Sequence, residues 1–267
     1  MKQIFIFAVA VMISGLFGCT SQGDTATAQT RETKQTQPTK PTETKAKAAV
    51  LVELFTSEGC SSCPSADRVL SQLEKQPNGE VEIITLALHV DYWNYLGWKD
   101  EFSSKQFSER QSGYADRFKL DSIYTPQMVV DGQTQFVGSN LDTANKAISD
   151  SAKNQKANIE ISNSNDKLVV KVADAPTHDD SYVWLAIAED DLKTNVRRGE
   201  NGGKTLDHVS VVREMKLLGS FAAADKIFNS ETALQLNPAW KKNDLKFVVF
   251  VQGKNSKKIF GAKKLEN

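Results

Sequence analysis

The chain has 267 residues, 40% of them hydrophobic, which is enough for one large core or two small ones. Basic residues and acidic residues number 33 each, so the net charge gives no indication of a nucleic-acid partner or of an acidic substrate. The three cysteines, Cys19, Cys60 and Cys63, are too few for a disulfide framework.

The amino-terminal residues have the pattern of an export signal. A basic start, Met1-Lys2, precedes the apolar run Ile4–Phe17, which has the length of a signal-peptide core and is short for a bilayer span. Leu16-Phe17-Gly18-Cys19 is similar to a bacterial lipobox, so residues 1–18 are predicted to be a lipoprotein-type signal peptide and Cys19 the lipidated amino terminus. An ordinary secretory signal cleaved elsewhere is the alternative. Both predict an exported chain, on the periplasmic face of a bacterial membrane or at the cell surface, where disulfides persist.

Residues 19–48 are rich in Thr, Gln, Lys and Ala and contain no large apolar residue. This composition predicts a disordered tether that holds a globular head clear of the membrane to which Cys19 is anchored. No later segment is apolar and long enough to be a transmembrane helix.

Residues 49–155 alternate between patterns of strands and helices. Continuous apolar runs predict buried strands, and apolar residues spaced three and four apart predict helices. In chain order we expect a strand at Val50–Phe55, a helix at Pro64–Lys75, a strand at Val81–Val90, a helix through Phe107–Phe118, a hairpin of Gln127–Val130 and Thr134–Val137, and a helix at Leu141–Ala152. This order, with the cysteine pair after the first strand, predicts a thioredoxin-like α/β domain.

Residues 156–267 read as an all-β domain. Short alternating strands are expected around Ile159–Ile161 and Leu168–Val172, and at Tyr182–Ala188, His208–Leu217, Lys246–Gln252 and Lys257–Lys263. Their spacing predicts an immunoglobulin-like sandwich. The stretch Phe221–Trp240 is ambiguous between irregular structure and a short helix.

Cys60 and Cys63 are separated by two residues at the junction of the first strand and the first helix. Two thiols at this spacing can close and open a small disulfide ring, which is the chemistry of a dithiol redox centre. We expect the sulfur of Cys60 at the surface, where the N–H groups of a helix start favour its thiolate, so Cys60 is the predicted nucleophile. Cys63, inside the helix, is expected to be less exposed and to resolve the mixed disulfide.

Pro126 stands just before the strand that starts at Gln127. A proline at this place in a thioredoxin fold is usually cis and packs opposite the cysteine pair, so we predict a cis bond. The backbone of Thr125 is then placed to pair with an extended substrate chain. A trans proline that starts an edge strand is the alternative.

Glu53 lies in a strand expected to be buried, where a carboxylate is costly unless it is paired or functional. It is a candidate proton relay to Cys63. Many thioredoxin-like proteins carry such an acid one residue closer to the first cysteine. Because side chains alternate along a strand, the extra residue would turn Glu53 to the opposite face of the strand, unless the loop after the strand accommodates that residue. Glu58 reads more simply as a solvated loop residue.

Aromatic and polar residues crowd the segment His89–Trp98, which follows the second strand at the edge where open α/β sheets place their sites. His89 and Trp93 are candidate substrate-binding residues. Alternatively, Trp93 and Trp98 anchor a loop to the core, and His89 is a packed, hydrogen-bonded histidine or a metal ligand or base. The charged, glycine-rich loop 197–203 is a partner contact or a solvated turn, and it lacks the context of a phosphate loop.

Four groups of residues resemble a domain-of-unknown-function family of secreted bacterial thioredoxin-like proteins. They are Val52–Pro64, His89–Trp93 with Leu96–Trp98, Tyr124–Gly132, and Arg197–Asn201 with Val211–Glu214. They cover both halves of the chain, from Val50 to about Lys264. The resemblance implies the thioredoxin-like fold and export, and adds little about the substrate.

Three functions compete. The leading prediction is a lipid-anchored thiol–disulfide oxidoreductase that acts on an exported protein substrate or redox partner, with Cys60 attacking, Cys63 resolving and Pro126 shaping the substrate groove. The second is a non-enzymatic surface binding module with a structural disulfide. The third is a carrier of a soft metal ion such as Cu(I), held by the two thiolates with His89 or Met128. No cofactor, no metal site and no nucleic-acid partner is predicted.

Overall fold

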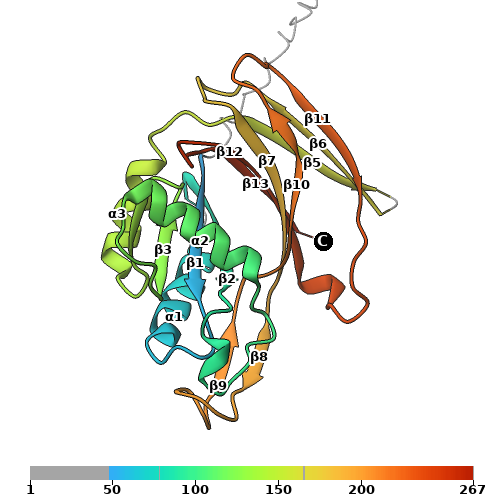
Figure 1. Ribbon diagram of the computed structural model, residues 1–267. Coiled ribbons are helices and arrows are strands. Elements are labelled where there is room, and N and C mark those ends of the chain that lie inside the picture. The colour runs from blue at the N-terminus through green and yellow to red at the C-terminus, as the bar shows by residue number, and fades with distance from the viewer. Residues whose placement is uncertain (1–47, 78, 165, 267) are drawn as a thin grey trace, which may run out of the picture. The chain divides into compact units, whose positions relative to one another are not determined.

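The computed structural model describes residues 48–77, 79–164 and 166–266 (Figure 1). The expected signal peptide and the lipidated Cys19 lie outside the described residues. So does the expected tether, apart from Ala48, which begins the first strand.

The amino-terminal half contains the strands and helices that the sequence predicts. Each begins and ends close to the expected residues. They are β1 (Ala48–Thr56), α1 (Cys63–Glu74), β2 (Val81–His89), α2 (Lys105–Phe118), β3 (Gln127–Val130), β4 (Thr134–Val137) and α3 (Leu141–Ser151). A 3₁₀ turn, η1 (Asn94–Leu96), which was not predicted, lies between β2 and α2.

Local chemistry explains where these elements begin and turn. Pro64 occupies the first turn of α1, where a missing N–H is tolerated. α2 begins after Ser104, whose side chain accepts a hydrogen bond from the N–H of Gln106. Between β3 and β4 the chain turns at Asp131 and Gly132, which have φ of 49° and 64°. A side chain at Gly132 would collide with the backbone of residue 257, so this turn fits closely against the carboxyl-terminal half.

The carboxyl-terminal half is built of strands. They are β5 (Asn158–Ser164), β6 (Lys167–Ala173), β7 (Ser181–Glu189), β8 (Leu192–Asn195), β9 (Thr205–His208), β10 (Val211–Phe221), β11 (Phe228–Ala233), β12 (Leu245–Gly253) and β13 (Ile259–Glu266), with the 3₁₀ turn η2 (Lys242–Asp244) before β12. The expectation of one strand from His208 to Leu217 is wrong at its start. His208 ends β9, and Ser210, with a φ of 55°, separates β9 from β10.

One mixed sheet of eight strands joins the two halves, in the order β13-β12-β7-β10-β2-β1-β3-β4. β1 and β2 are parallel, β3 is antiparallel to β1, and β10 meets β2 in parallel at Val211 and Ala87. A three-stranded sheet, β11-β6-β5, and the β8–β9 hairpin complete the fold. The described residues form one compact α/β unit, so the boundary expected between residues 155 and 156 stays a prediction.

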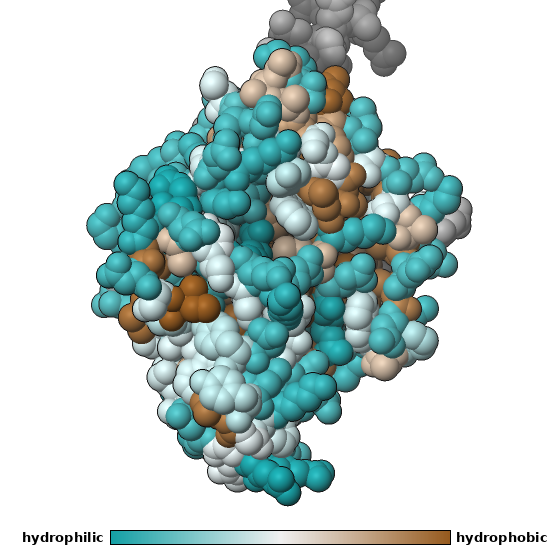
Figure 2. All heavy atoms as spheres, viewed as in Figure 1, coloured by the Kyte–Doolittle hydropathy of each residue, from teal (hydrophilic) through white to brown (hydrophobic). Residues whose placement is uncertain are grey.

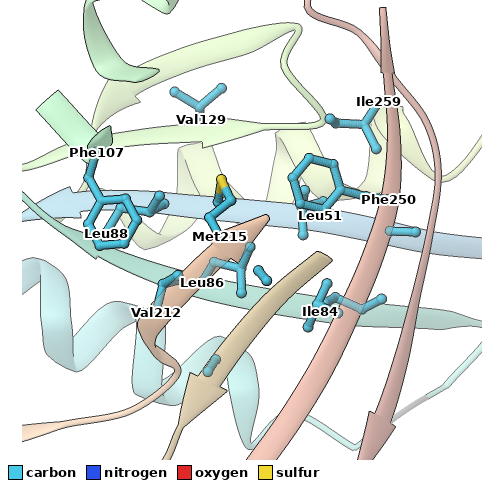
Figure 3. Packing of buried hydrophobic residues seen from close by; sticks show 14 of the residues in the cluster. Leu51, Ile84, Leu86, Leu88, Phe107, Val129, Val212, Met215, Phe250 and Ile259 are labelled. Atoms are coloured by element: carbon cyan, nitrogen blue, oxygen red, sulfur yellow. The ribbon is translucent and has the colours of Figure 1, made fainter. Parts of the chain in front are cut away.

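The central hydrophobic core draws on both halves of the chain (Figure 3). Leu51 and Leu86, from β1 and β2, belong to the same buried cluster as Val212, Met215 and Phe250 from β10 and β12. A second cluster fills the space between β1–β3 and the helices α1 and α3, and a third lies between β7, β12, β13 and the three-stranded sheet. Each fully buried large aliphatic side chain stabilises the fold by about 1.5–3 kcal/mol.

The surface is mostly polar on the face shown in Figure 2, with hydrophobic side chains in separate small areas. Tyr95, the most exposed of the large hydrophobic side chains described, lies in the loop after β2. Within the described ranges, no helix has the length and apolar character needed to cross a membrane.

Candidate redox site

Cys60 and Cys63 form a disulfide, with their Cα atoms 5.4 Å apart. β1 ends at Thr56, and the short loop that follows carries Cys60 to the point where α1 begins at Cys63. The predicted position of the cysteine pair, between a buried parallel strand and the start of a helix, is therefore confirmed.

The predicted exposure of Cys60 is wrong. Both cysteines have no solvent-exposed surface, whereas Ser61 and Ser62 between them are exposed. The hydroxyl of Ser62 lies 3.3 Å from the Cys60 sulfur. The expected attack at an open sulfur is thus not available in this conformation. Another segment of the chain also lies against the cysteine loop.

That segment is the loop between β8 and β9, residues 196–204, which we call the covering loop. The Asn201 amide nitrogen donates hydrogen bonds to the backbone carbonyls of Glu58 and Cys60, both at 2.9 Å, and Asn201 itself is fully buried. Next to it, a Glu200 carboxylate oxygen accepts a hydrogen bond from the backbone N–H of Ser61 at 2.9 Å. β9 also contacts α1, which holds the hairpin beside the helix start (Figure 1).

The aromatic loop after β2 closes another side of the site. The Trp98 indole N–H donates to Glu58 Oε2 at 2.7 Å, and Gly199 of the covering loop lies against Trp98. Trp93 lies against Gly59 and donates from its indole N–H to Thr125 Oγ1 at 2.9 Å. The aromatic segment therefore bridges the cysteine loop to the predicted substrate-binding residue Thr125.

The peptide bond between Thr125 and Pro126 is cis, as the sequence predicts. Pro126 precedes β3, which pairs with β1, the strand that leads to the cysteines. The backbone carbonyl of Pro126 accepts a hydrogen bond from the N–H of Gly138 at 3.0 Å, which ties the proline to the end of β4.

A cluster of ionisable side chains lies beneath the cysteine loop. Asp100 Oδ2 accepts from the N–H of Glu58 at 2.9 Å and lies 2.7 Å from His89 Nδ1. The imidazole rings of His89 and His208 are 5.2 Å apart, and His208 Nε2 lies 3.3 Å from Glu58 Oε1. Asp67, four residues after Cys63 in α1, accepts a hydrogen bond from the Thr56 hydroxyl at 2.8 Å. The interpretation of Glu58 as a solvated loop residue is wrong, because its side chain is buried in this cluster.

Burial and neighbouring charges shift the pKa values within this cluster. Burial raises the pKa of Asp67, and the charges of His89 and His208 only partly offset it. Burial opposes ionisation of Asp100 and His89 as well. The charge of the partner residue and the hydrogen bond between the two outweigh burial, so the pKa of Asp100 is lowered and the pKa of His89 is raised. Both shifts favour the charged forms, a protonated His89 beside an ionised Asp100.

Across the described residues, four buried side-chain polar atoms lack a hydrogen-bond partner, and three of them are in this cluster: Glu58 Oε1, His89 Nε2 and His208 Nε2. Glu58 Oε1 and His208 Nε2 lie 3.3 Å apart, at ion-pair distance, which leaves His89 Nε2 as the one atom of the three with neither a hydrogen bond nor an ion pair to the described residues. Such atoms are rare in folded proteins. Over the same ranges, no group of three or more His, Cys, Asp or Glu side chains is arranged to hold a metal ion.

Glu53 lies in a different network. Its carboxylate forms an ion pair with Arg110 at 2.6 Å and accepts a hydrogen bond from the Tyr114 hydroxyl. Arg110 in turn donates to Gln252 of β12 at 2.8 Å. These contacts pair the Glu53 carboxylate with α2, and through Arg110 they link it to β12. They offer no support for a proton relay to Cys63.

The described geometry brings Cys60, Cys63, Thr125, Pro126 and Trp93 into one region and leaves His89 beneath it. His89 is 1% exposed, so in this conformation its ring does not reach a surface where substrate would lie. Sequence reasoning missed Asp67, Asp100, His208 and Asn201 as members of the site. Only Asn201 carried a signal, since it lies in the glycine-rich loop noted above.

Fold and site together define a mixed α/β protein whose Cys-x-x-Cys disulfide stands where the first strand meets the first helix. The chain belongs to the family described as protein of unknown function (DUF1223), whose model matches residues 51–252. The resemblance to a domain-of-unknown-function family is thereby confirmed. No curated protein matches the chain.

Two solved structures are similar in fold. Protein AGR_C_4864 from Agrobacterium tumefaciens is 24% identical, with a TM-score of 0.68 over 83% of this chain and 96% of its own. HBP35 of Porphyromonas gingivalis is 15% identical, with a TM-score of 0.56 over 82% of this chain and 75% of its own. At these identities the likeness concerns the fold.

Proposed function

We propose that the protein is an exported thiol–disulfide oxidoreductase that acts on protein disulfides. The observation that carries the proposal is the Cys60–Cys63 disulfide at the start of α1, in a sheet that also presents the cis Pro126. In the reducing direction, the Cys60 thiolate attacks a substrate disulfide and releases one substrate thiolate. Cys63 then attacks the Cys60 sulfur, releases the second substrate thiolate and restores the disulfide; oxidation of a substrate runs in reverse.

The arrangement of elements supports a thioredoxin-like unit for residues 49–155. In sheet order β2-β1-β3-β4, β1 and β2 are parallel and β3 and β4 are antiparallel neighbours, with the cysteines after β1 and the cis proline before β3. For residues 156–267, β5, β6 and β11 facing β7, β12 and β13 across a shared core support the immunoglobulin-like sandwich.

In this proposal, Thr125, Pro126 and Trp93 form the surface against which a substrate chain lies. The hydrogen bond between Trp93 and Thr125 supports their acting as one surface. The export signal and lipobox at Met1–Cys19 support attachment to a bacterial membrane, at its periplasmic face or at the cell surface. Incorporation of a labelled fatty acid, abolished by Cys19→Ser, tests this attachment.

The decisive experiment compares Cys60→Ser and Cys63→Ser chains in the reduction of a protein disulfide by dithiol. We expect both variants to lose turnover, and Cys63→Ser alone to accumulate a mixed disulfide with substrate, because only Cys60 is the attacking thiol. Ser112→Ala, at an exposed position on α2, is the control and should keep turnover. Undiminished turnover by Cys60→Ser would contradict the proposal.

Burial of both sulfurs favours a second candidate, a binding module whose disulfide is a structural staple. The reduction potential separates the two. A structural disulfide typically has a potential below about −300 mV, whereas a working dithiol centre lies roughly between −270 and −120 mV. Equilibration with glutathione buffers measures it.

A further inference from the structure

The covering loop is hydrogen-bonded to the cysteine loop, although the two are far apart in the chain. The cysteines follow β1, whereas the segment bonded to their loop comes from the β8–β9 hairpin, and Asn201 is separated from Cys60 by 141 residues in sequence. The Asn201 side-chain amide is fully buried and donates to two carbonyls of the cysteine loop, so the two loops pack closely at this point. Exchange with any thiol needs in-line approach to a sulfur, and in this conformation neither sulfur is accessible.

The covering loop has the features of a segment that can move away from the cysteine loop. Within residues 196–204 only Val196 and Asn201 are buried, so opening exposes at most one apolar side chain of the loop. Gly199 and Gly203 have φ of 77° and 82° and bracket the contacting residues. The hydrogen bonds that shape the loop tip, from Gly202 to Gly199 and from Lys204 to Asn201, are internal to it and are kept if it moves as a unit.

We infer that residues 196–204 are a movable cover on the redox centre, with Asn201 as its latch, and that thiol exchange at Cys60 takes place after the cover opens. The inference rests on the proposed function for its biological meaning. Its test does not, because it concerns the chain's own disulfide and a small thiol.

Glu200 adds an electrostatic effect of the covering loop on the Cys60 thiol. Its carboxylate accepts from the N–H of Ser61 and lies beside the helix start, where a Cys60 thiolate would draw on the same N–H groups. A negative charge at this place disfavours the thiolate. The closed cover therefore shields the Cys60 sulfur and suppresses its ionisation, and opening reverses both effects.

The experiment measures the rate at which dithiothreitol reduces Cys60–Cys63 in the full chain. A dithiothreitol thiolate attacks the Cys60 sulfur, Cys63 leaves as a thiolate and is protonated, and the second dithiothreitol thiol displaces Cys60 to form the cyclic disulfide. Samples are quenched in acid, alkylated and weighed by mass spectrometry. Asn201→Ala removes both latch hydrogen bonds and should accelerate reduction about tenfold. Asn195→Ala, an exposed position on the same hairpin, should leave the rate unchanged.

Since Asn201 is buried, Glu200→Ala gives a second variant whose folding is not in question, because Glu200 is exposed. It should accelerate reduction about threefold and shift the alkylation of reduced Cys60 to lower pH. Wild-type rates in both variants would overturn the inference. If both variants are reduced faster but the wild-type chain never turns over a protein disulfide, the cover is supported and the proposed function is contradicted. If the wild-type chain does turn over a protein disulfide but both variants are reduced at the wild-type rate, the proposed function is supported and the cover is contradicted.

Discussion

Asp67 is a residue of the candidate site whose ionisation burial opposes. Burial raises its pKa above the ordinary 3.8, so the folded chain binds this proton more tightly than the unfolded chain does. The stability that this proton supplies is fully present below the unfolded pKa and is lost as the pH rises through the folded one. Above the unfolded pKa, the buried carboxyl group of Asp67 therefore lowers the free energy of unfolding.

Asp67→Asn should remove this cost, since the amide oxygen can still accept from Thr56. We expect the variant to be more stable than the wild type at pH 7 by on the order of 1 kcal/mol, with the difference vanishing near pH 3. Thermal unfolding followed by circular dichroism across this pH range checks it. A difference independent of pH would show that the carboxylate charge is not the cause.

At the level of elements, α2 is tied to the sheet by a buried ion pair. Arg110 of α2 reaches Glu53 of β1 and Gln252 of β12, and its guanidinium also lies over the ring of Tyr114. Removing one partner of such a pair leaves an uncompensated buried charge, which is worse than removing both.

Arg110→Met should therefore destabilise the fold by about 3–5 kcal/mol, and adding Glu53→Gln should recover most of the loss. Urea unfolding of the two single variants and the double variant measures the coupling. If Glu53→Gln alone slowed thiol exchange without reducing stability, the proton relay expected from the sequence would regain support.

At the level of the whole molecule, the two halves share a sheet and a core. β2 pairs with β10, and β1 and β2 face a cluster completed by Met215, Phe250 and Ile259. Lys246 of β12 lies 2.8 Å from Glu74 at the end of α1 and 3.0 Å from Asp190, which adds a buried polar contact between the halves.

A fragment of residues 49–155 should therefore fail to fold cooperatively on its own. Without the carboxyl-terminal strands, one edge of β2 and part of the central core are exposed to water. We expect a broad thermal transition and binding of a hydrophobic dye, against a sharp transition in a chain of residues 45–267. A sharp transition in the fragment would support the two domains expected from the sequence.

The sequence predicts what local patterns determine. Apolar periodicity locates α1 and β1, the turn residues Asp131-Gly132 locate the β3–β4 hairpin, and the cysteine spacing locates the redox pair. The contact of the covering loop with the cysteine loop and the pairing of β10 with β2 were not predictable. Both join residues far apart in the chain, and the local hydrophobic pattern carries no information about such contacts. For the same reason the sequence offered Glu53 as a candidate proton relay and gave no indication of Asp67, which follows Cys63 by one helical turn and accepts a hydrogen bond from Thr56.

The long sequence separation between Cys60 and Asn201 has a consequence for biosynthesis. A ribosome that adds about 5–20 residues per second completes the cysteine pair roughly 7–28 seconds before it reaches the asparagine. During that interval no covering loop exists to bond to the cysteine residues. Any protection of the pair therefore begins only when the completed chain folds.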